Sequence, residues 1–298
     1  MYFKAKDEKS IYYKKWNNVE KPRAVLHIVH GMCEHINRYD DFAKFLNQNK
    51  IIVYGMDTRG HGRTVTKNER FGDFGEEVDW EDILEDIETL MTTEKKNYNL
   101  PFFILGHSMG SFIVRHFIQI TNQKLNGAII VGTGNSDDMR YTLVRFILKF
   151  LKQKKDSKFV HGLAFGSNNS KIINPKTKLD WLSTDENEVQ KYISDKYCGF
   201  NVTNRFYKVF LNGLKKLTIA ENEFKLDKKV PLLFIAGESD PVGNMGKYVS
   251  EIVKKYQDKG CSNLDSIIYP GMRHEIINDV NKSKVYEDIL EFILSNIN

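Results

Sequence analysis

Short apolar runs alternate with amphipathic stretches along most of the chain. Five stretches between the runs have helical spacing, at residues 39–47, 78–96, 109–121, 246–256 and 282–297. The apolar runs are expected to be buried strands: RAVLHIVHG (23–31), IIVYGMD (51–57), PFFILGHS (101–108), NGAIIVGTG (126–134), PLLFIAGESD (231–240) and LDSIIYPG (264–271). This alternation predicts an α/β fold with a mostly parallel, doubly wound sheet. With YFKAKD and SIYYKKW as an antiparallel edge hairpin, the sheet has about eight strands.

The alternation is interrupted once, between about residues 135 and 225. This stretch contains helical pieces, one expected from Tyr141 to Lys152 and another opened by Ser183 and Glu186 as a capping box. A helical insertion between two strands of an open sheet lies over their carboxyl ends, where such sheets bind ligands. We therefore predict a core formed by residues 1–134 and 226–298, with a helical cap or lid at 135–225.

Composition and charge exclude several classes of function. The 44 Lys and Arg exceed the 39 Asp and Glu only slightly and are spread along the chain, which disfavours a nucleic-acid surface. The three cysteines, Cys33, Cys198 and Cys261, are spaced unlike a zinc or disulfide framework, and MYFKAKDEKS is not a signal peptide. We expect a cytoplasmic protein with no cofactor and no metal. Transient contact of the cap with a membrane surface stays open, and the sequence does not determine the oligomeric state.

Gly106-His107-Ser108-Met109-Gly110 is the strongest chemical motif in the chain. It follows the apolar run PFFIL and precedes the helical stretch FIVRHFIQI, so Ser108 is expected at a sharp strand–turn–helix with its hydroxyl exposed. Glycines two residues to either side leave room for the outgoing helix to cross the incoming strand. This context predicts a nucleophilic serine rather than a simple turn.

A serine nucleophile requires a base and an acid that orients the base. Of the eight histidines, His274 in YPGMRHEI follows the last strand and precedes the last helix, and we assign it as the base. We assign Asp240, which ends PLLFIAGESD before Pro241, as the acid. Three alternatives stay open for the acid: Glu238, Asp137 and Asp138.

Two further groups of residues are expected to contact a substrate. The backbone N–H of Met109 and that of Met32, in the loop HGMCEH, are candidates for an oxyanion hole. In the expected helix at 141–152, apolar residues cover more than half of the circumference. We expect Phe146 and Ile147 in that helix to line an acyl tunnel.

Several pieces of the chain resemble the α/β-hydrolase superfamily, and within it the monoacylglycerol lipase and lysophospholipase-like group related to serine aminopeptidases. They are HGMCEHINRYDDFAKFL, YGMDTRGHGRT, LGHSMGS, GESDPV, YPGMRHE and the cap stretch WLSTDENEVQKYISDKYCGF. Together they cover most of the chain in family-like order and spacing. The resemblance implies Ser108, Asp240 and His274 as the triad, and Met32 and Met109 as oxyanion donors.

The preferred hypothesis is a cofactor-independent serine hydrolase that cleaves carboxylic esters of single-chain lipids, either a monoacylglycerol or a lysophospholipid. The first alternative is an aminopeptidase or thioesterase on the same fold. The second is a non-catalytic ligand receptor, which would be expected to lack a triad residue. The cap's acidic residues lie mainly in DENE, a helix start, which disfavours recognition of a substrate's free amine.

Overall fold

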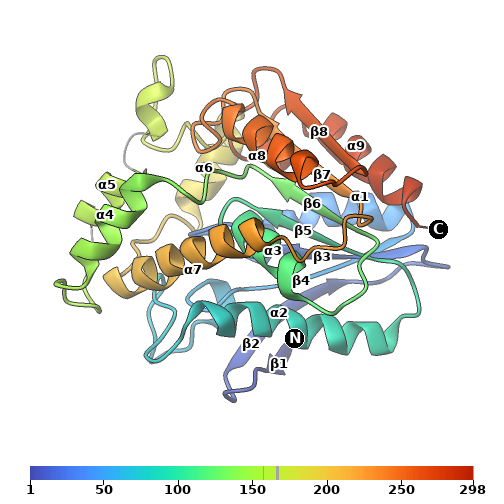
Figure 1. Ribbon diagram of the computed structural model, residues 1–298, viewed down its shortest axis with the longest axis horizontal. Helices are drawn as coiled ribbons and strands as arrows, with labels where there is room; N and C mark the ends of the chain where they lie inside the picture. Colours follow the sequence, from blue (N-terminus) through green and yellow to red (C-terminus); the bar gives the residue numbers. More distant parts are fainter. Residues whose placement is uncertain (157, 166–167, 298) are drawn as a thin grey trace.

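The computed structural model describes residues 1–156, 158–165 and 168–297 and is built around one eight-stranded sheet (Figure 1). The strands lie in the order β1-β2-β4-β3-β5-β6-β7-β8. β1 and β2 form the predicted antiparallel hairpin at one edge, and β3 to β8 run parallel. The predicted α/β fold class is confirmed. The strand bounds are Tyr2–Lys4 (β1), Ser10–Trp16 (β2), Ala24–Val29 (β3), Ile51–Met56 (β4), Phe102–His107 (β5), Gly127–Val131 (β6), Leu232–Gly237 (β7) and Leu264–Tyr269 (β8).

Helices cover both faces of the sheet because the central strands are buried on both sides. In β3 the side chains of Val25 and Val29 join one hydrophobic cluster, whereas Leu26 and Ile28 join the other. α1 (Asp40–Gln48) and α9 (Lys282–Ser295) close one face. α2 (Trp80–Asn97), α3 (Met109–Ile120) and α8 (Lys247–Asp258) close the other.

The segment between β6 and β7 carries four α-helices among its described residues: α4 (Met139–Leu148), α5 (Lys158–Phe165), α6 (Glu186–Ser194) and α7 (Asn204–Glu223). α4 and α5 project at one side of the molecule (Figure 1). α7 packs along α3 through apolar contacts and a buried ion pair in which Arg115 contacts Glu221 at 2.8 Å. We retain the division into core and cap as a proposal, and the helical content of this segment supports it.

Two details of the cap differ from the sequence-based expectations. The helix expected to reach Lys152 ends at Leu148, because the side-chain amide of Gln153 donates to the carbonyl oxygens of Leu148 and Leu151 at 3.0 and 2.9 Å. Ser183 does not cap α6. Asp185 does, since its carboxylate accepts the backbone N–H of Asn187 at 2.9 Å, so the cap lies two residues later in the chain than expected.

Candidate active site

Ser108 lies at the turn between β5 and α3 with a backbone conformation that non-glycine residues rarely adopt, at φ 53° and ψ −117°. A Cβ at Gly106 would lie 2.3 Å from the carbonyl oxygen of Gly110, and one at Gly110 would lie 2.1 Å from that of Val29. Both positions therefore require glycine, because α3 starts in close contact with β5 and with the end of β3. The predicted strand–turn–helix is present, with backbone strain at the serine.

Hydrogen bonds connect Ser108 to His274 and His274 to Asp240. His274 Nε2 lies 2.8 Å from Ser108 Oγ, and His274 Nδ1 lies 3.0 Å from Asp240 Oδ1. Asp240 is fully buried, and its Oδ1 also accepts the backbone N–H of Val242 at 2.8 Å. A carboxylate at Nδ1 selects the tautomer whose Nε2 is free to accept the serine proton. The structure thus brings together the three residues assigned from the sequence.

The loops after β7 and β8 position the acid and the base. A Cβ at Gly237, the last residue of β7, would lie 2.2 Å from the carbonyl oxygens of Met272 and Arg273, so the His274 loop lies directly against the end of β7. The cap contributes Trp181, whose carbonyl accepts the backbone N–H of His274 at 3.4 Å. The rings of Trp181 and His274 lie 5.1 Å apart. Residues of both core and cap therefore orient the histidine.

The alternative acids lie elsewhere. Glu238 is exposed, and its carboxylate accepts the backbone N–H of Gly271 at 2.9 Å. Asp138 is the N-cap of α4 and pairs with Arg140, and Asp137 is exposed. Asp240 is therefore the carboxylate placed to orient His274.

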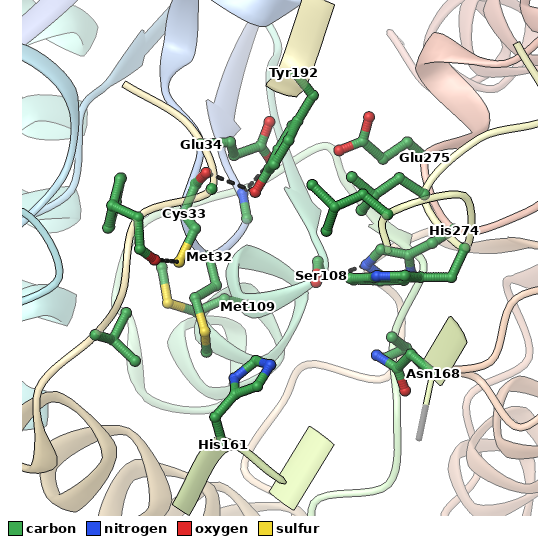
Figure 2. A pocket seen from close by; sticks show the side chains of 18 of the residues that line it. Met32, Cys33, Glu34, Ser108, Met109, His161, Asn168, Tyr192, His274 and Glu275 are labelled. Carbon is green, nitrogen blue, oxygen red and sulfur yellow. Dashed lines mark hydrogen bonds between the residues drawn. The ribbon is translucent and has the colours of Figure 1, made fainter. Parts of the chain in front are cut away.

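The two residues expected to form an oxyanion hole both line the cavity at Ser108. Figure 2 shows the side chains of Met32 and Met109 on one side of Ser108 and His274 on the other. Met109 is the first residue of α3, so its N–H has no acceptor within the helix. Met32 follows Gly31 in the turn after β3.

The cavity has a volume of about 490 Å³, within the range of ligand pockets. One part of its lining is apolar and comes from core and cap: Met32, Met109, Phe112, Leu179, Leu182, Phe200, Val202, Phe210 and Val242. Another part is polar and comes mainly from the cap: Lys158, His161, Asn168, Asn169 and Lys178. Figure 2 shows His161 and Asn168 across the cavity from Glu34 and Tyr192. The cavity thus offers apolar surface at the nucleophile and cationic groups from the cap.

Phe146 and Ile147 do not line this cavity. Phe146 is 58% exposed, and its ring lies 5.4 Å from that of Phe150, which is 75% exposed. Ile147 is partly buried. The structure therefore brings neither residue to Ser108, because α4 directs Phe146 outward and α7 supplies Phe210 in its place.

Sequence reasoning missed a charged network beside the nucleophile. Arg38 pairs with both oxygens of Glu275 at 2.6 Å and with Glu34 at 3.1 Å. Glu34 in turn lies 3.1 Å from Nδ1 of His107. The available signal was the run of charged and histidine residues in HGMCEHINRY directly after a buried strand. Trp181 contacts His274, and the hydroxyl of Tyr192 donates to the carbonyl of Cys33 at 2.7 Å. These contacts depend on how the cap folds and have no local signal.

Cys33 is packed rather than reactive. Its thiol donates to the carbonyl of Phe200 at 3.2 Å, and burial raises its pKa to about 12. A thiol that stays protonated is a poor nucleophile.

One group of possible metal ligands occurs among the described residues. Ligand atoms of His35, Asp195 and Cys198 lie within 4.8 Å of one another, and a 2.9 Å contact joins His35 Nε2 to Asp195 Oδ2. None of the three lines the cavity at Ser108. Burial raises the pKa of Cys198, which disfavours the thiolate that would bind a metal.

Residues 20–281 match the family described as "Serine aminopeptidase, S33". The chain belongs to this family. It is 25% identical over 292 residues to the monoacylglycerol lipase of Mycolicibacterium smegmatis, covering 96% of this chain and 94% of that one. It is also 25% identical over 274 residues to the monoglyceride lipase of Homo sapiens, and the match covers 90% of this chain and 80% of the human protein.

Solved structures show the same architecture over the whole chain. A thermostable carboxyl esterase from Bacillus coagulans, in complex with glycerol, superposes with a TM-score of 0.91 at 29% identity and covers 100% of this chain and 98% of its own. A soluble variant of monoglyceride lipase from Saccharomyces cerevisiae, in complex with a substrate analogue, superposes with a TM-score of 0.79 at 19% identity. The match covers 100% of this chain and 94% of the yeast protein. That second likeness concerns the fold alone.

This S33-family chain is an α/β-hydrolase of the monoacylglycerol lipase-like group and a carboxylic ester hydrolase, with lipase or esterase function. Among the described residues, no helix is both long and apolar enough to cross a membrane.

Proposed function

We propose that the protein hydrolyses esters of single-chain lipids through an acyl-enzyme formed on Ser108. His274 accepts the serine proton as Ser108 attacks the ester carbonyl, and Asp240 stabilises the imidazolium. The N–H groups of Met32 and Met109 bind the oxyanion. His274 then protonates the leaving alcohol, and a water molecule repeats the cycle on the acyl-enzyme. The 2.8 Å contact between His274 Nε2 and Ser108 Oγ carries the proposal.

The lining of the cavity supports one acyl chain and an ester head group as the substrate. Its apolar residues suit a hydrocarbon chain, and each buried methylene contributes about 0.8 kcal/mol of binding free energy. The cap residues Lys158 and Lys178 lie on the polar part of the lining. These cations favour the lysophospholipid within the proposed class, because a phosphate carries the complementary charge.

An aminopeptidase is the weaker candidate despite the family's name. Recognition of a free amine requires a carboxylate that is not already neutralised. The two carboxylates among the described lining residues, Glu34 and Glu275, are both paired with Arg38. The polar cap lining adds cations rather than anions.

A fluorophosphonate probe and a substrate panel test this function. The probe is expected to label the wild type and not Ser108→Ala. In the folded Ser108→Ala and His274→Ala proteins, ester turnover is expected to fall by about 10⁴-fold, because the triad acts as a unit. The panel comprises a monoacylglycerol, a lysophospholipid with an anionic head group, a short p-nitrophenyl ester and an aminoacyl amide. Near wild-type kcat in folded His274→Ala, or preferential cleavage of the amide, would overturn the proposal.

A further inference from the structure

Glu34 is a buried carboxylate that the reaction described above does not use. Its side chain is 2% exposed, and it lies two residues after Met32 in the loop that follows β3. Its Oε1 accepts the backbone N–H of Gly31 at 2.6 Å and the hydroxyl of Tyr39 at 3.0 Å. Burying a charge is costly unless it is paired and hydrogen-bonded. These contacts tie Glu34 to the loop that carries Met32.

The same carboxylate reaches the nucleophile turn. Glu34 Oε1 lies 3.1 Å from Nδ1 of His107, the residue directly before Ser108. Burial would raise the pKa of Glu34, but the hydrogen bond from His107 and the charge of Arg38 outweigh it and hold this pKa well below its usual range. Burial would likewise lower the pKa of His107, and the hydrogen bond to Glu34 instead raises it. Glu34 is therefore the anionic acceptor, and we assign Nδ1–H of His107 as the donor.

An oxyanion hole needs its two N–H donors at a fixed separation, and here they belong to separate segments. Met32 follows β3, and Met109 follows β5. The last pair between β3 and β5 is Val29 with Gly106. The strand pairing therefore ends before it reaches Met32 or Met109. Contacts outside the sheet must therefore set the distance between them, and the packing of Gly110 against the carbonyl of Val29 is one of these.

Gly31 and His107 supply a second contact of this kind through Glu34. A Cβ at Gly31 would lie 2.7 Å from Glu34 Oε1 and 3.2 Å from both His107 Nδ1 and Ser108 Cβ. The loop after β3 is therefore packed directly on the nucleophile turn, with the Glu34 carboxylate bonded to both segments.

We propose that Glu34 is a positioning residue that sets the separation of the two oxyanion donors by binding Gly31 N–H and His107 at once. The proposal rests on the proposed function, since it takes Ser108 as the nucleophile. The carbonyl oxygen gains its full charge only in the tetrahedral intermediate. Loosening the donors therefore slows the reaction and leaves binding of the uncharged substrate unchanged.

Glu34→Gln tests the proposal because it keeps the shape of the side chain and removes its charge. We expect kcat on a soluble p-nitrophenyl ester to fall by about 10–100-fold, less than the 10²–10³-fold typical of deleting a donor, with KM within about twofold. Affinity for a trifluoromethyl ketone, which forms a tetrahedral oxyanion adduct with serine, should fall by the same factor as kcat/KM. Affinity for an ether analogue of the substrate, which forms no oxyanion, should not change.

His107 provides a rescue experiment. His107→Asn can place an amide N–H where Nδ1 lies and should retain most of the activity, whereas His107→Leu should resemble Glu34→Gln. The losses of Glu34→Gln and His107→Leu should be less than additive in the double variant, because both weaken or remove the Glu34–His107 contact. His107→Leu also removes the 3.4 Å contact between His107 Nε2 and the carbonyl of His274. Asp86→Asn is the matched control, since Asp86 is a buried carboxylate paired with Arg59 at 2.7 Å away from the cavity lining. It should lower stability and leave kcat unchanged.

The outcomes separate this proposal from the proposed function. Wild-type kcat in folded Glu34→Gln, a loss confined to KM, or an equal loss for the ether analogue would overturn it. Additive losses in the double variant would also overturn it. If Glu34→Gln does not fold, full activity in His107→Leu would do the same. A wild type that neither cleaves the ester nor binds the ketone would overturn both proposals together.

Discussion

Asp240 and Glu238 lie two residues apart after β7, yet their side chains have different surroundings. Asp240 is fully buried and contacts His274 Nδ1 at 3.0 Å, whereas Glu238 is exposed and contacts the backbone of Gly271. Sequence spacing alone left both open. The contact of His274 with the buried carboxylate of Asp240 identifies Asp240, rather than Glu238, as the acid.

Asp240→Asn is expected to lower kcat by about 10³–10⁴-fold, because an amide does not stabilise the imidazolium and can select the wrong tautomer. Glu238→Gln is the matched control and should stay within about twofold of wild type. Steady-state kinetics on a soluble ester, with circular dichroism as a check of folding, measures both. A larger loss in Glu238→Gln than in Asp240→Asn would show that the acid was wrongly assigned.

Local signals made part of the site predictable. Ser108 is bracketed by glycines between an apolar run and a helix, and Asp240 and His274 each follow a strand in the required chain order. Glu34 gave a weaker signal because its role depends on His107, 73 positions away in the sequence. Trp181 contacts His274 only because the cap folds back over the core. Long-range contacts of this kind have no periodicity that a sequence pattern could show.

At the scale of elements, the core was predictable and the cap less so. The core strands alternate with helices because both sheet faces must be covered, which leaves a clear apolar pattern. α4 ends at Leu148 rather than Lys152, where the side chain of Gln153 binds the carbonyl of the last helical residue. The apolar arc of α4 predicted burial, yet Phe146 is 58% exposed. The apolar face of a cap helix can contact solvent, lipid or the protein core. Hydrophobic periodicity in the sequence does not distinguish these three environments.

Several of the exposed apolar residues of the cap lie on or beside the neighbouring helices α4 and α5. On α4 and just after it, Met139, Leu143, Phe146 and Phe150 are 88%, 58%, 58% and 75% exposed, and Phe159 on α5 is 64% exposed. Lys149, Lys152 and Lys158 lie among them in the sequence. Apolar side chains flanked by lysines are typical of surfaces that contact anionic lipid, and we propose that the cap makes transient contact of this kind.

The double variant Phe146→Ser, Phe150→Ser tests that contact. We expect kcat/KM on a long-chain monoacylglycerol in anionic vesicles to fall by about 3–10-fold, because less apolar area reaches the interface. Turnover of a dissolved short-chain p-nitrophenyl ester should not change, since neither residue lines the cavity. Equal losses on the two substrates would contradict the membrane contact. A matching loss on a dissolved long-chain ester would instead support a role for α4 in binding the acyl chain.

At the scale of the whole molecule, one buried polar side chain links the sheet to the pH dependence of stability. His27 in β3 is fully buried, and its ring stacks on Tyr54 of β4 with centroids 4.4 Å apart. Neither ring nitrogen has a hydrogen-bond partner among the described residues. Burial lowers the pKa of His27 to about 3. The imidazole is therefore neutral in the folded protein throughout the physiological range.

This shift makes His27 a source of acid sensitivity. In the unfolded chain a histidine has a pKa of about 6.5, so below that pH the unfolded state binds a proton that the folded state does not. The contribution of His27 to the free energy of unfolding is complete above pH ~6.5 and falls as the pH drops toward ~3. Between pH 7.5 and pH 5 the loss from this one residue is about 2 kcal/mol.

His27→Phe is expected to remove that loss, because phenylalanine keeps the stacked ring and has no proton to bind. The measurement is urea unfolding at pH 7.5 and pH 5, comparing the change in unfolding free energy rather than its absolute value, since the larger ring has its own packing cost. Tyr54→Phe is the control: burial raises the pKa of Tyr54 well above its usual range, so it does not titrate in this window. It should keep the wild-type pH dependence. If His27→Phe and wild type lose the same stability between the two pH values, His27 is protonated or hydrated in the folded sheet, and its burial does not limit acid stability.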